Sequence, residues 1–346
     1  MVGANKYFGT ILLSALASSL SIGAERGKAI VDDPAYTHSQ QLVEVEPGRK
    51  LNLYCTGKGS PTVVFDSGVT GETVGWALVQ PVIAGHTRAC SYDRAGTGFS
   101  DPGTRTGTSA NIVDDLHRLL TAAAIAPPYI LVGHSYGGMN VRLYKDHYPS
   151  DVVGMVLVDP SHEDWVERVW RLSLLQRPYE QRVADFEPMW RDERECVRAA
   201  TLGFVKGSAP YEKCISDPDP RFSDAINAVY LKRHLLLAYH QAGLTEDENL
   251  HFASSDQVRA ARIWYGDMPL VVLAAGDRPK RRTDEPQAHR DAINRLWYVL
   301  FDELAALSTR GVNRVVPNTG HDIPMTQPGA VNGAILDVMD QVSKTK

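Results

Sequence analysis

The sequence predicts an α/β fold in which a mostly parallel, doubly wound sheet carries an inserted helical cap. Three observations support this prediction: near-continuous apolar runs of strand length, helical patterns between those runs, and a stretch of about a hundred residues after residue 160 in which strand runs vanish. Apolar runs without alternation are typical of strands that are covered on both faces, as in a parallel sheet. The alternation of strand and helix patterns indicates a doubly wound arrangement.

The sheet is expected to begin with an antiparallel hairpin and to continue through buried strands. The stretch "QQLVEVEPGRKLNLYC" alternates apolar and polar residues on either side of Pro47 and Gly48, which is the pattern of a hairpin at a sheet edge. Five near-continuous apolar runs follow: "PTVVFDSG", "TRACSYDRAG", "YILVGHS", "VVGMVLVDP" and "PLVVLAAGD".

Amphipathic helices are expected to cover this sheet. Residues 111–124 place their apolar side chains at helical spacing and carry two aspartates in the first turn, where the helix dipole favours acids. A second helix is predicted over residues 138–148 and ends before Pro149. Residues 330–342 repeat the helical spacing and predict a closing helix packed on the sheet.

The chain divides into four predicted segments. Residues 1–24 have the plan of a secretory signal peptide, with cleavage after Ala24; an uncleaved membrane anchor is the alternative. The core is expected over residues 25–160 and 263–346, with the helical cap inserted over residues 161–262. No segment after residue 24 is apolar for long enough to span a membrane, so the mature protein is expected to be secreted or periplasmic, with no stable membrane span.

Composition narrows the class of partner. The net charge of -5 and the pI near 6.1 leave no basic excess for a nucleic-acid backbone, so we expect a small-molecule substrate and no nucleic acid. The oligomeric state cannot be read from the sequence.

The four cysteines suit an oxidising compartment. Four cysteines allow three pairings, and the sequence alone does not choose among them. We prefer Cys55 with Cys90 and Cys196 with Cys214, because each pair then joins one local region. No cysteine has metal-ligand spacing, and we expect no metal site.

The stretch "YILVGHSYGGMN" changes from strand formers to helix formers at Ser135. A serine on a sharp strand-to-helix turn needs small residues two places before and after it, because a Cβ there would collide with the adjoining strand or helix. Gly133 and Gly137 meet that need. Such a turn holds the hydroxyl at a helix N-terminus, where backbone N–H groups stabilise an oxyanion. Ser135 is therefore the candidate nucleophile.

A serine nucleophile needs a base and an orienting acid. Among eleven histidines, His321 in "NTGHDIP" follows an apolar run and precedes the closing helix, in the order that the nucleophile requires. His321 is therefore the candidate base. Structural or surface roles are expected for the other histidines considered, namely His134, His162, His234 and His240, although His162 also borders the site.

The chain resembles the α/β-hydrolase superfamily in the order of its motifs. These motifs are "VVFDSG", "SYDRAGTGFSD", "LVGHSYGG", "VLVDPSH", "PLVVLAAG" and "NTGHDIP". The resemblance covers nearly everything after the signal segment and implies the α/β-hydrolase fold. Serine at the elbow makes the chain similar to the esterase and lipase branch, because haloalkane dehalogenases and epoxide hydrolases of this fold carry aspartate there.

The resemblance leaves two positions for the acid. Most members place it after the strand that corresponds to "PLVVLAAG", where Asp277 follows Gly276 directly and the usual spacing is broken. A minority place it one strand earlier, where Asp159 ends "VLVD". We favour Asp159 and keep Asp277 as the alternative.

The resemblance also implies an oxyanion hole formed by the backbone N–H groups of Tyr136 and Val69. The histidine-glycine pair common before the second donor is replaced here by Ser67 and Gly68. In "YDRAGTGFSD", Asp93 and Arg94 are interpreted as a structural ion pair.

The expected activity is hydrolysis of a carboxylic ester through an acyl-enzyme, without metal or organic cofactor. Two other hypotheses stay open: an amidase, peptidase-like enzyme or lactone hydrolase on the same triad, and a non-catalytic binding protein of the same fold.

Overall fold

The computed structural model describes residues 29–172, 179–277 and 287–344. The predicted signal peptide lies outside these described residues. Within them the chain forms a sheet of eight strands in the order β1-β2-β4-β3-β5-β6-β7-β8. The strands are β1 (Gln41–Glu46), β2 (Arg49–Thr56), β3 (Thr62–Asp66), β4 (Ala89–Tyr92), β5 (Tyr129–His134), β6 (Val152–Val158), β7 (Leu270–Ala275) and β8 (Gly311–Val316).

The pairing confirms the predicted mixture of an antiparallel edge and a parallel body. Strand β1 pairs with β2 and β2 with β4 in antiparallel register, whereas every pair from β4–β3 through to β7–β8 is parallel. The strands of the parallel body are buried on both faces, except β8 at the edge, where Val312 and Val315 are exposed. This burial explains why the interior strands read as continuous apolar runs.

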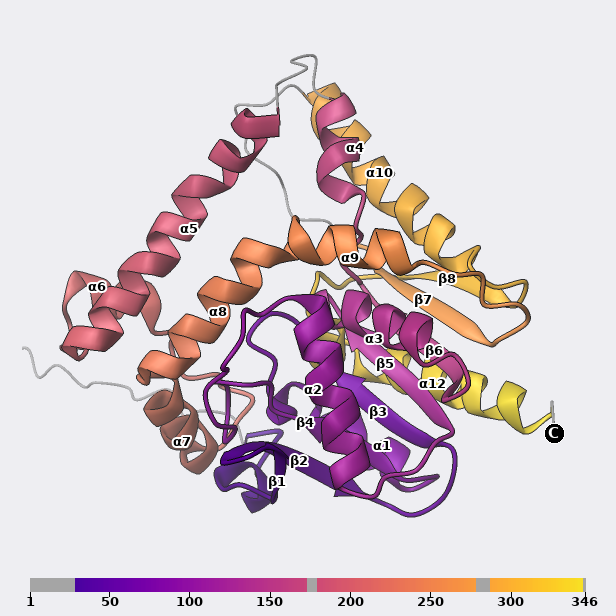
Figure 1. Ribbon diagram of the computed structural model, residues 1–346, viewed down its shortest axis with the longest axis horizontal. Coiled ribbons are helices and arrows are strands. Elements are labelled where there is room, and N and C mark those ends of the chain that lie inside the picture. Colours follow the sequence, from indigo (N-terminus) through magenta and orange to yellow (C-terminus); the bar gives the residue numbers. More distant parts are fainter. Residues whose placement is uncertain (1–28, 173–178, 278–286, 345–346) are drawn as a thin grey trace, which may run out of the picture.

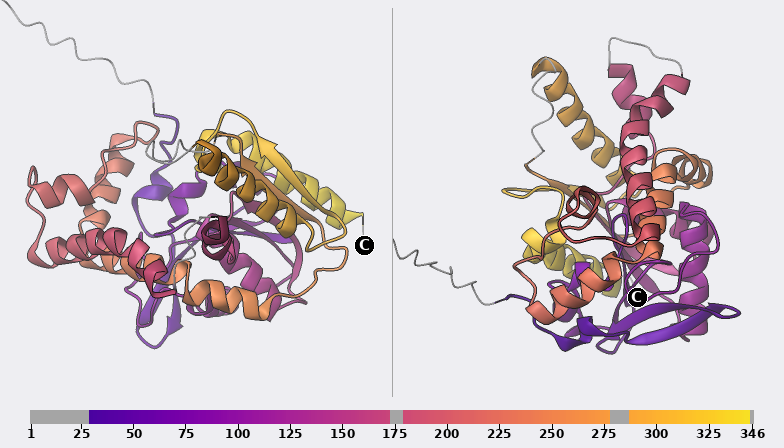
Figure 2. Two further views of the ribbon diagram at one scale, coloured as in Figure 1. Left: turned by 90° about the horizontal axis from the view of Figure 1, so that it is seen from above. Right: turned by 90° about the vertical axis from the view of Figure 1, so that its left-hand side faces the viewer.

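Helices cover both faces of the sheet (Figures 1 and 2). One apolar layer packs α2 (Ser109–Ala122), α3 (Tyr136–His147) and α10 (Gln287–Ala305) against the sheet. The other layer packs α1 (Gln80–Ala84) and α12 (Pro328–Ser343) against the opposite face. Short helices complete the described core: η1 (Pro34–Thr37), η2 (Thr73–Trp76) and α11 (Ile323–Thr326).

The insertion between β6 and β7 is helical, as predicted. Its described residues form α4 (Trp165–Leu172), α5 (Tyr179–Leu202), α6 (Ala209–Cys214), α7 (Asp224–His234), α8 (Leu237–Leu250) and α9 (Ala253–Ala261). Figure 1 shows α8 and α9 passing above α2 and α3, while α5 and the first turns of α10 extend away from the sheet. The cap is therefore joined closely to the core along α8 and α9.

Both preferred cysteine pairings are confirmed. Cys55 and Cys90 are direct partners across the β2–β4 pair and form a disulfide with a Cα–Cα distance of 4.1 Å. Cys196 of α5 bonds to Cys214 of α6, with a Cα–Cα distance of 5.6 Å. One bridge thus joins core strands and the other joins two helices of the cap.

Candidate active site

The strand-to-helix turn holds Ser135 in an uncommon backbone conformation. Ser135 lies between β5 and α3 with φ 53° and ψ -119°, a region that non-glycine residues rarely adopt. A Cβ on Gly137 would lie 2.2 Å from Asp66 O, and one on Gly133 would lie 2.4 Å from Gly137 O. Both positions therefore require glycine, for the reason that the sequence suggested.

His321 lies in the loop between β8 and α11. Its Nδ1 donates to Asp159 Oδ2 at 2.7 Å, which leaves Nε2 as the ring nitrogen that can accept a proton from a nucleophile. No hydrogen bond joins Ser135 Oγ to His321 within the described part of the chain, and such contacts are often long in ligand-free enzymes. The imidazole is 55% exposed, so the site is open to solvent on this side.

Asp159, directly after β6, is held in place by hydrogen bonds to both of its carboxylate oxygens. While Oδ2 accepts from His321, Oδ1 accepts from the Ala275 N–H at 2.9 Å. The side chain is only 1% exposed. Asp277, by contrast, is exposed, and no side-chain bond from it to His321 is present among the residues described. The structure thus brings Asp159 to the candidate base and leaves Asp277 outside the contact.

His134, the residue before the nucleophile, supports the loop that carries His321. Its Nε2 donates to the His321 carbonyl oxygen at 2.9 Å, and the two rings are 4.8 Å apart. Burial and the neighbouring His321 lower the pKa of His134 to about 4. The neutral ring is therefore a fixed donor near pH 7, which fits the structural role that the sequence suggested.

The loop after β3 lies directly against the nucleophile. A Cβ on Gly68 would lie 3.3 Å from Ser135 Cβ. The N–H groups of Val69 and Tyr136 have no hydrogen-bond partner among the described residues, and Tyr136 begins α3. Free N–H groups beside a serine are what an oxyanion hole requires.

The interpretation of Asp93 and Arg94 as an ion pair is wrong. Arg94 pairs with Asp66 at 2.7 Å and with Glu246 of α8 at 2.8 Å. Asp93 instead accepts from the Thr73 N–H, from the Phe99 N–H and from Asn52. Adjacent residues at the end of a strand point in different directions, so opposite charges next to each other in sequence need not meet.

Glu246 is the site residue that the sequence did not suggest. It belongs to the cap helix α8, and its Oε2 accepts from the Thr70 N–H at 2.7 Å, in the loop after β3. Nothing in the composition of the cap distinguishes this glutamate from the other acids around it. Only the three-dimensional arrangement brings it to the core.

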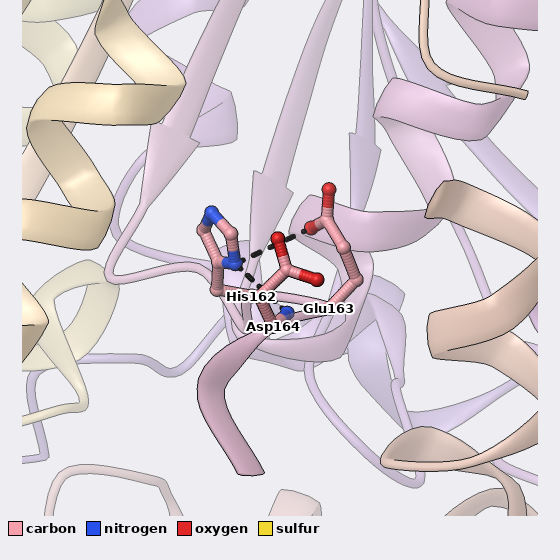
Figure 3. A group of neighbouring side chains, drawn as sticks. All are labelled: His162, Glu163 and Asp164. Carbon is pink, nitrogen blue, oxygen red and sulfur yellow. Dashed lines mark hydrogen bonds and ion pairs between the residues drawn. The ribbon is translucent and has the colours of Figure 1, made fainter. Parts of the chain in front are cut away.

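Three consecutive residues after β6, His162, Glu163 and Asp164, could supply one metal-ligating atom each within 4.8 Å of one another (Figure 3). Their partners make a cation site unfavourable. Glu163 accepts from Arg142 at 2.6 Å, and Asp164 accepts from Arg259 at 2.8 Å. His162 Nδ1 accepts from the Asp164 N–H, and burial lowers the pKa of His162 to about 4. Arginine side chains thus already neutralise the carboxylates that a metal ion would need as ligands.

A cavity of about 410 Å³ lies between α2, α8 and the loop after β4. Arg94 and Glu246 form part of its wall. Neither Ser135 nor His321 is among the described residues that line this cavity, so the cavity is not the place where the scissile bond of a substrate would lie.

The chain belongs to the alpha/beta hydrolase family, whose model matches residues 63–334. The uncharacterized protein YqjL of Bacillus subtilis is 23% identical to it over 283 residues, which are 82% of this chain and 85% of that protein. An AB hydrolase superfamily protein of Gibberella zeae is 31% identical over 132 residues, 35% of this chain and 41% of its own length.

Solved structures show the same fold at low sequence identity. The epoxide hydrolase CorEH has a TM-score of 0.57 at 14% identity, over 88% of this chain and 99% of that one. A bromoperoxidase from Bacillus anthracis has a TM-score of 0.58 at 16% identity, over 87% of this chain and all of that one (100%). These neighbours carry different activities on one scaffold, so the activity has to be argued from the site.

Proposed function

We propose that this chain is a serine hydrolase that cleaves carboxylic esters through an acyl-enzyme. One observation carries the proposal: Ser135 is held at a strained turn, in a chain order of serine, aspartate and histidine, with His321 bonded to Asp159 at 2.7 Å. This order is the one used on the strand-turn-helix nucleophile of such folds.

The reaction follows from the positions of the side chains. His321 Nε2 takes the Ser135 proton while Oγ attacks the ester carbonyl, and the N–H groups of Val69 and Tyr136 stabilise the resulting oxyanion. The alcohol leaves with the proton from His321. Water then loses a proton to the same nitrogen, attacks the acyl group and releases the carboxylic acid and free Ser135. Asp159 accepts the Nδ1–H bond and so keeps the proton on Nδ1 of the base.

The elbow residue argues against the epoxide hydrolysis of the structural neighbour CorEH. By the resemblance, epoxide hydrolases carry aspartate at the elbow, and here the residue is Ser135. The same serine machinery would also cleave an amide or a lactone, and no contact in the described part of the cap favours either of these over an ester.

The test is hydrolysis of a series of p-nitrophenyl esters by residues 25–346, beside Ser135→Ala. We expect turnover by the wild type, a loss of at least about a thousandfold in the variant, and labelling of Ser135 by an organophosphonate. A folded wild type that neither labels nor hydrolyses any ester would overturn the proposal. Faster turnover of matched amides or lactones would change the proposed substrate class from esters to amides or lactones, and Ser135 would remain the proposed nucleophile.

The disulfides also bear on the location of the protein in the cell. Two disulfides form in the structure, and disulfides persist mainly in oxidising compartments. No helix among the described residues is long and apolar enough to cross a membrane. The disulfides and the signal-like first 24 residues support a secreted or periplasmic protein.

A further inference from the structure

We propose that Arg94 and Glu246 are positioning residues that aim the Val69 N–H at the reacting carbonyl, so that a cap helix helps to set the oxyanion hole. The proposal rests on the proposed hydrolase function. It concerns two side chains that touch neither Ser135 nor His321 and that belong to different parts of the chain, the loop after β4 and helix α8.

All five N–H groups of the Arg94 guanidinium have defined acceptors. Nε and Nη2 form a two-bond contact with the Glu246 carboxylate, each at 2.8 Å. Nη1 donates to Asp66 Oδ1 at 2.7 Å and to Ser67 O at 2.8 Å, and Nη2 also donates to Gly68 O. A planar fork with five donors fixes its acceptors in one geometry, which a lysine cannot do.

The bond to Gly68 O determines where the Val69 N–H points. Gly68 O and Val69 N belong to one peptide unit, and in a trans peptide the C=O and N–H groups point in opposite directions. Because Arg94 holds the carbonyl, the N–H of Val69 is directed away from the guanidinium. Gly68 itself lies against the nucleophile, since a Cβ added to it would be 3.3 Å from Ser135 Cβ, and the Val69 N–H has no hydrogen-bond partner among the described residues.

Glu246 constrains the next peptide unit as well. Its Oε2 accepts from the Thr70 N–H at 2.7 Å, so this N–H is occupied and does not compete with that of Val69. Thr70 has a φ of 58°, which a non-glycine residue holds only when its surroundings impose it. The helix approaches closely here, since a Cβ on Gly243 would lie 3.1 Å from the Thr70 methyl group.

Burial makes this arrangement sensitive to the loss of either partner. The side chains of Arg94 and Glu246 are each only 3% exposed, so their paired groups are largely shielded from water. Removing the carboxylate would leave Arg94 and the Thr70 N–H with unsatisfied donors, and the loop would rearrange to satisfy them. The oxyanion donor on that loop would then lose its preorganised direction.

The test compares Glu246→Gln, Glu246→Asp and Arg94→Lys with the wild type in ester hydrolysis and in binding of a trifluoromethyl ketone, which forms a tetrahedral oxyanion with the serine. Asp115→Asn is the matched control. Asp115 accepts two hydrogen bonds from Arg49, of 3.0 and 2.6 Å, and this pair lies away from Ser135. We expect kcat to fall about 10- to 100-fold in the first three variants. KM should change less than about threefold, and ketone affinity should fall in proportion to kcat. The control should lose stability but keep kcat within about twofold.

Equal kcat per folded molecule in Glu246→Gln and the wild type would overturn the proposal, as would a control that loses kcat to the same extent. A crystal structure of Glu246→Asp supplies a readout that does not need turnover. A rotated Gly68–Val69 peptide supports the inference, and an unchanged peptide refutes it. Absence of ester turnover in the wild type would refute only the proposed function.

Discussion

At the scale of single residues, Ser135 is kept in a strained backbone conformation by fixed contacts around it. The φ of 53° at Ser135 costs on the order of 1–3 kcal/mol. Its N–H donates to Val158 O at 3.1 Å, and its carbonyl accepts from Ser161 at 2.8 Å and from Gly138 at 3.0 Å. The β6 strand and the loop after it therefore hold the turn from one side, and the same segment supplies Asp159.

A paired substitution tests which aspartate completes the triad. In Asp159→Asn the amide oxygen can accept from His321 or from the Ala275 N–H but not from both, and an NH₂ group faces the remaining donor. We expect kcat to fall by about 10³- to 10⁴-fold. Asp277→Asn is the control and should stay within about twofold, because this side chain is exposed. The reverse ranking in p-nitrophenyl ester turnover would reassign the acid.

A second residue-scale prediction concerns Glu163 and pH. Burial alone would raise the pKa of Glu163, but Arg142, His162 and Arg262 hold it well below its ordinary value. A lowered carboxyl pKa gives stability that is complete above the unfolded value of about 4.3 and is lost as the pH falls below it. Glu163→Gln removes this contribution and leaves the Arg142 charge buried, at a cost of about 3–5 kcal/mol near neutral pH.

Urea unfolding from about pH 3 to about pH 7 measures this effect. We expect the difference in free energy of unfolding between wild type and Glu163→Gln to be constant above about pH 5 and to shrink below about pH 4.3. A difference that does not change with pH would show that Glu163 acts through its shape and not through its charge.

At the scale of elements, the helices of the cap differ in how directly they contact the core. Helices α8 and α9 contact the core through buried polar bonds, such as Ser254 Oγ, which accepts from the Ser109 N–H at 3.0 Å. Helices α5 and α6 are joined to each other by Cys196–Cys214 at a distance from the nucleophile turn (Figure 1). This end of the cap is therefore expected to unfold locally without unfolding the sheet.

Replacing Cys196 and Cys214 together by alanine tests that separation. The sequence separation of 18 residues predicts a loss of about 3 kcal/mol from loop-closure entropy. Hydrogen exchange should show faster opening in α5 and α6, with the sheet unchanged. The value of kcat at about 25 °C should stay within about twofold. Faster exchange throughout the sheet would mean that the cap end and the core unfold as one unit.

At the scale of the whole molecule, the sequence predicted what local patterns determine. Continuous apolar runs predicted the parallel strands, and the glycines around Ser135 predicted the turn. The preferred disulfides followed from local proximity along the chain. Helix boundaries were less accurate: α3 begins at Tyr136, directly after the nucleophile, and not at residue 138.

Contacts between distant segments were not predictable in this way. Arg94 and Glu246 are separated by 152 residues, and no periodicity in either segment indicates the other. The choice between Asp159 and Asp277 did not follow from strand order either: Asp277 follows β7, the neighbour of β8, whereas His321 bonds to Asp159 at the end of β6. Helix α10 was not assigned from the sequence.

The two disulfides are expected to contribute a large part of the stability of the folded chain. Loop separations of 35 and 18 residues predict contributions of about 4 and about 3 kcal/mol. Their sum is comparable with the total stability of a typical domain, about 5–15 kcal/mol. Residues 25–346 refolded with dithiothreitol should therefore unfold at much lower urea concentration than the same chain refolded under oxidising conditions.

A variant with all four cysteines replaced by alanine should match the reduced chain and should not respond to dithiothreitol. If the reduced and oxidised chains unfold at the same urea concentration, the bridges are not needed for stability, and they no longer support a secreted or periplasmic location.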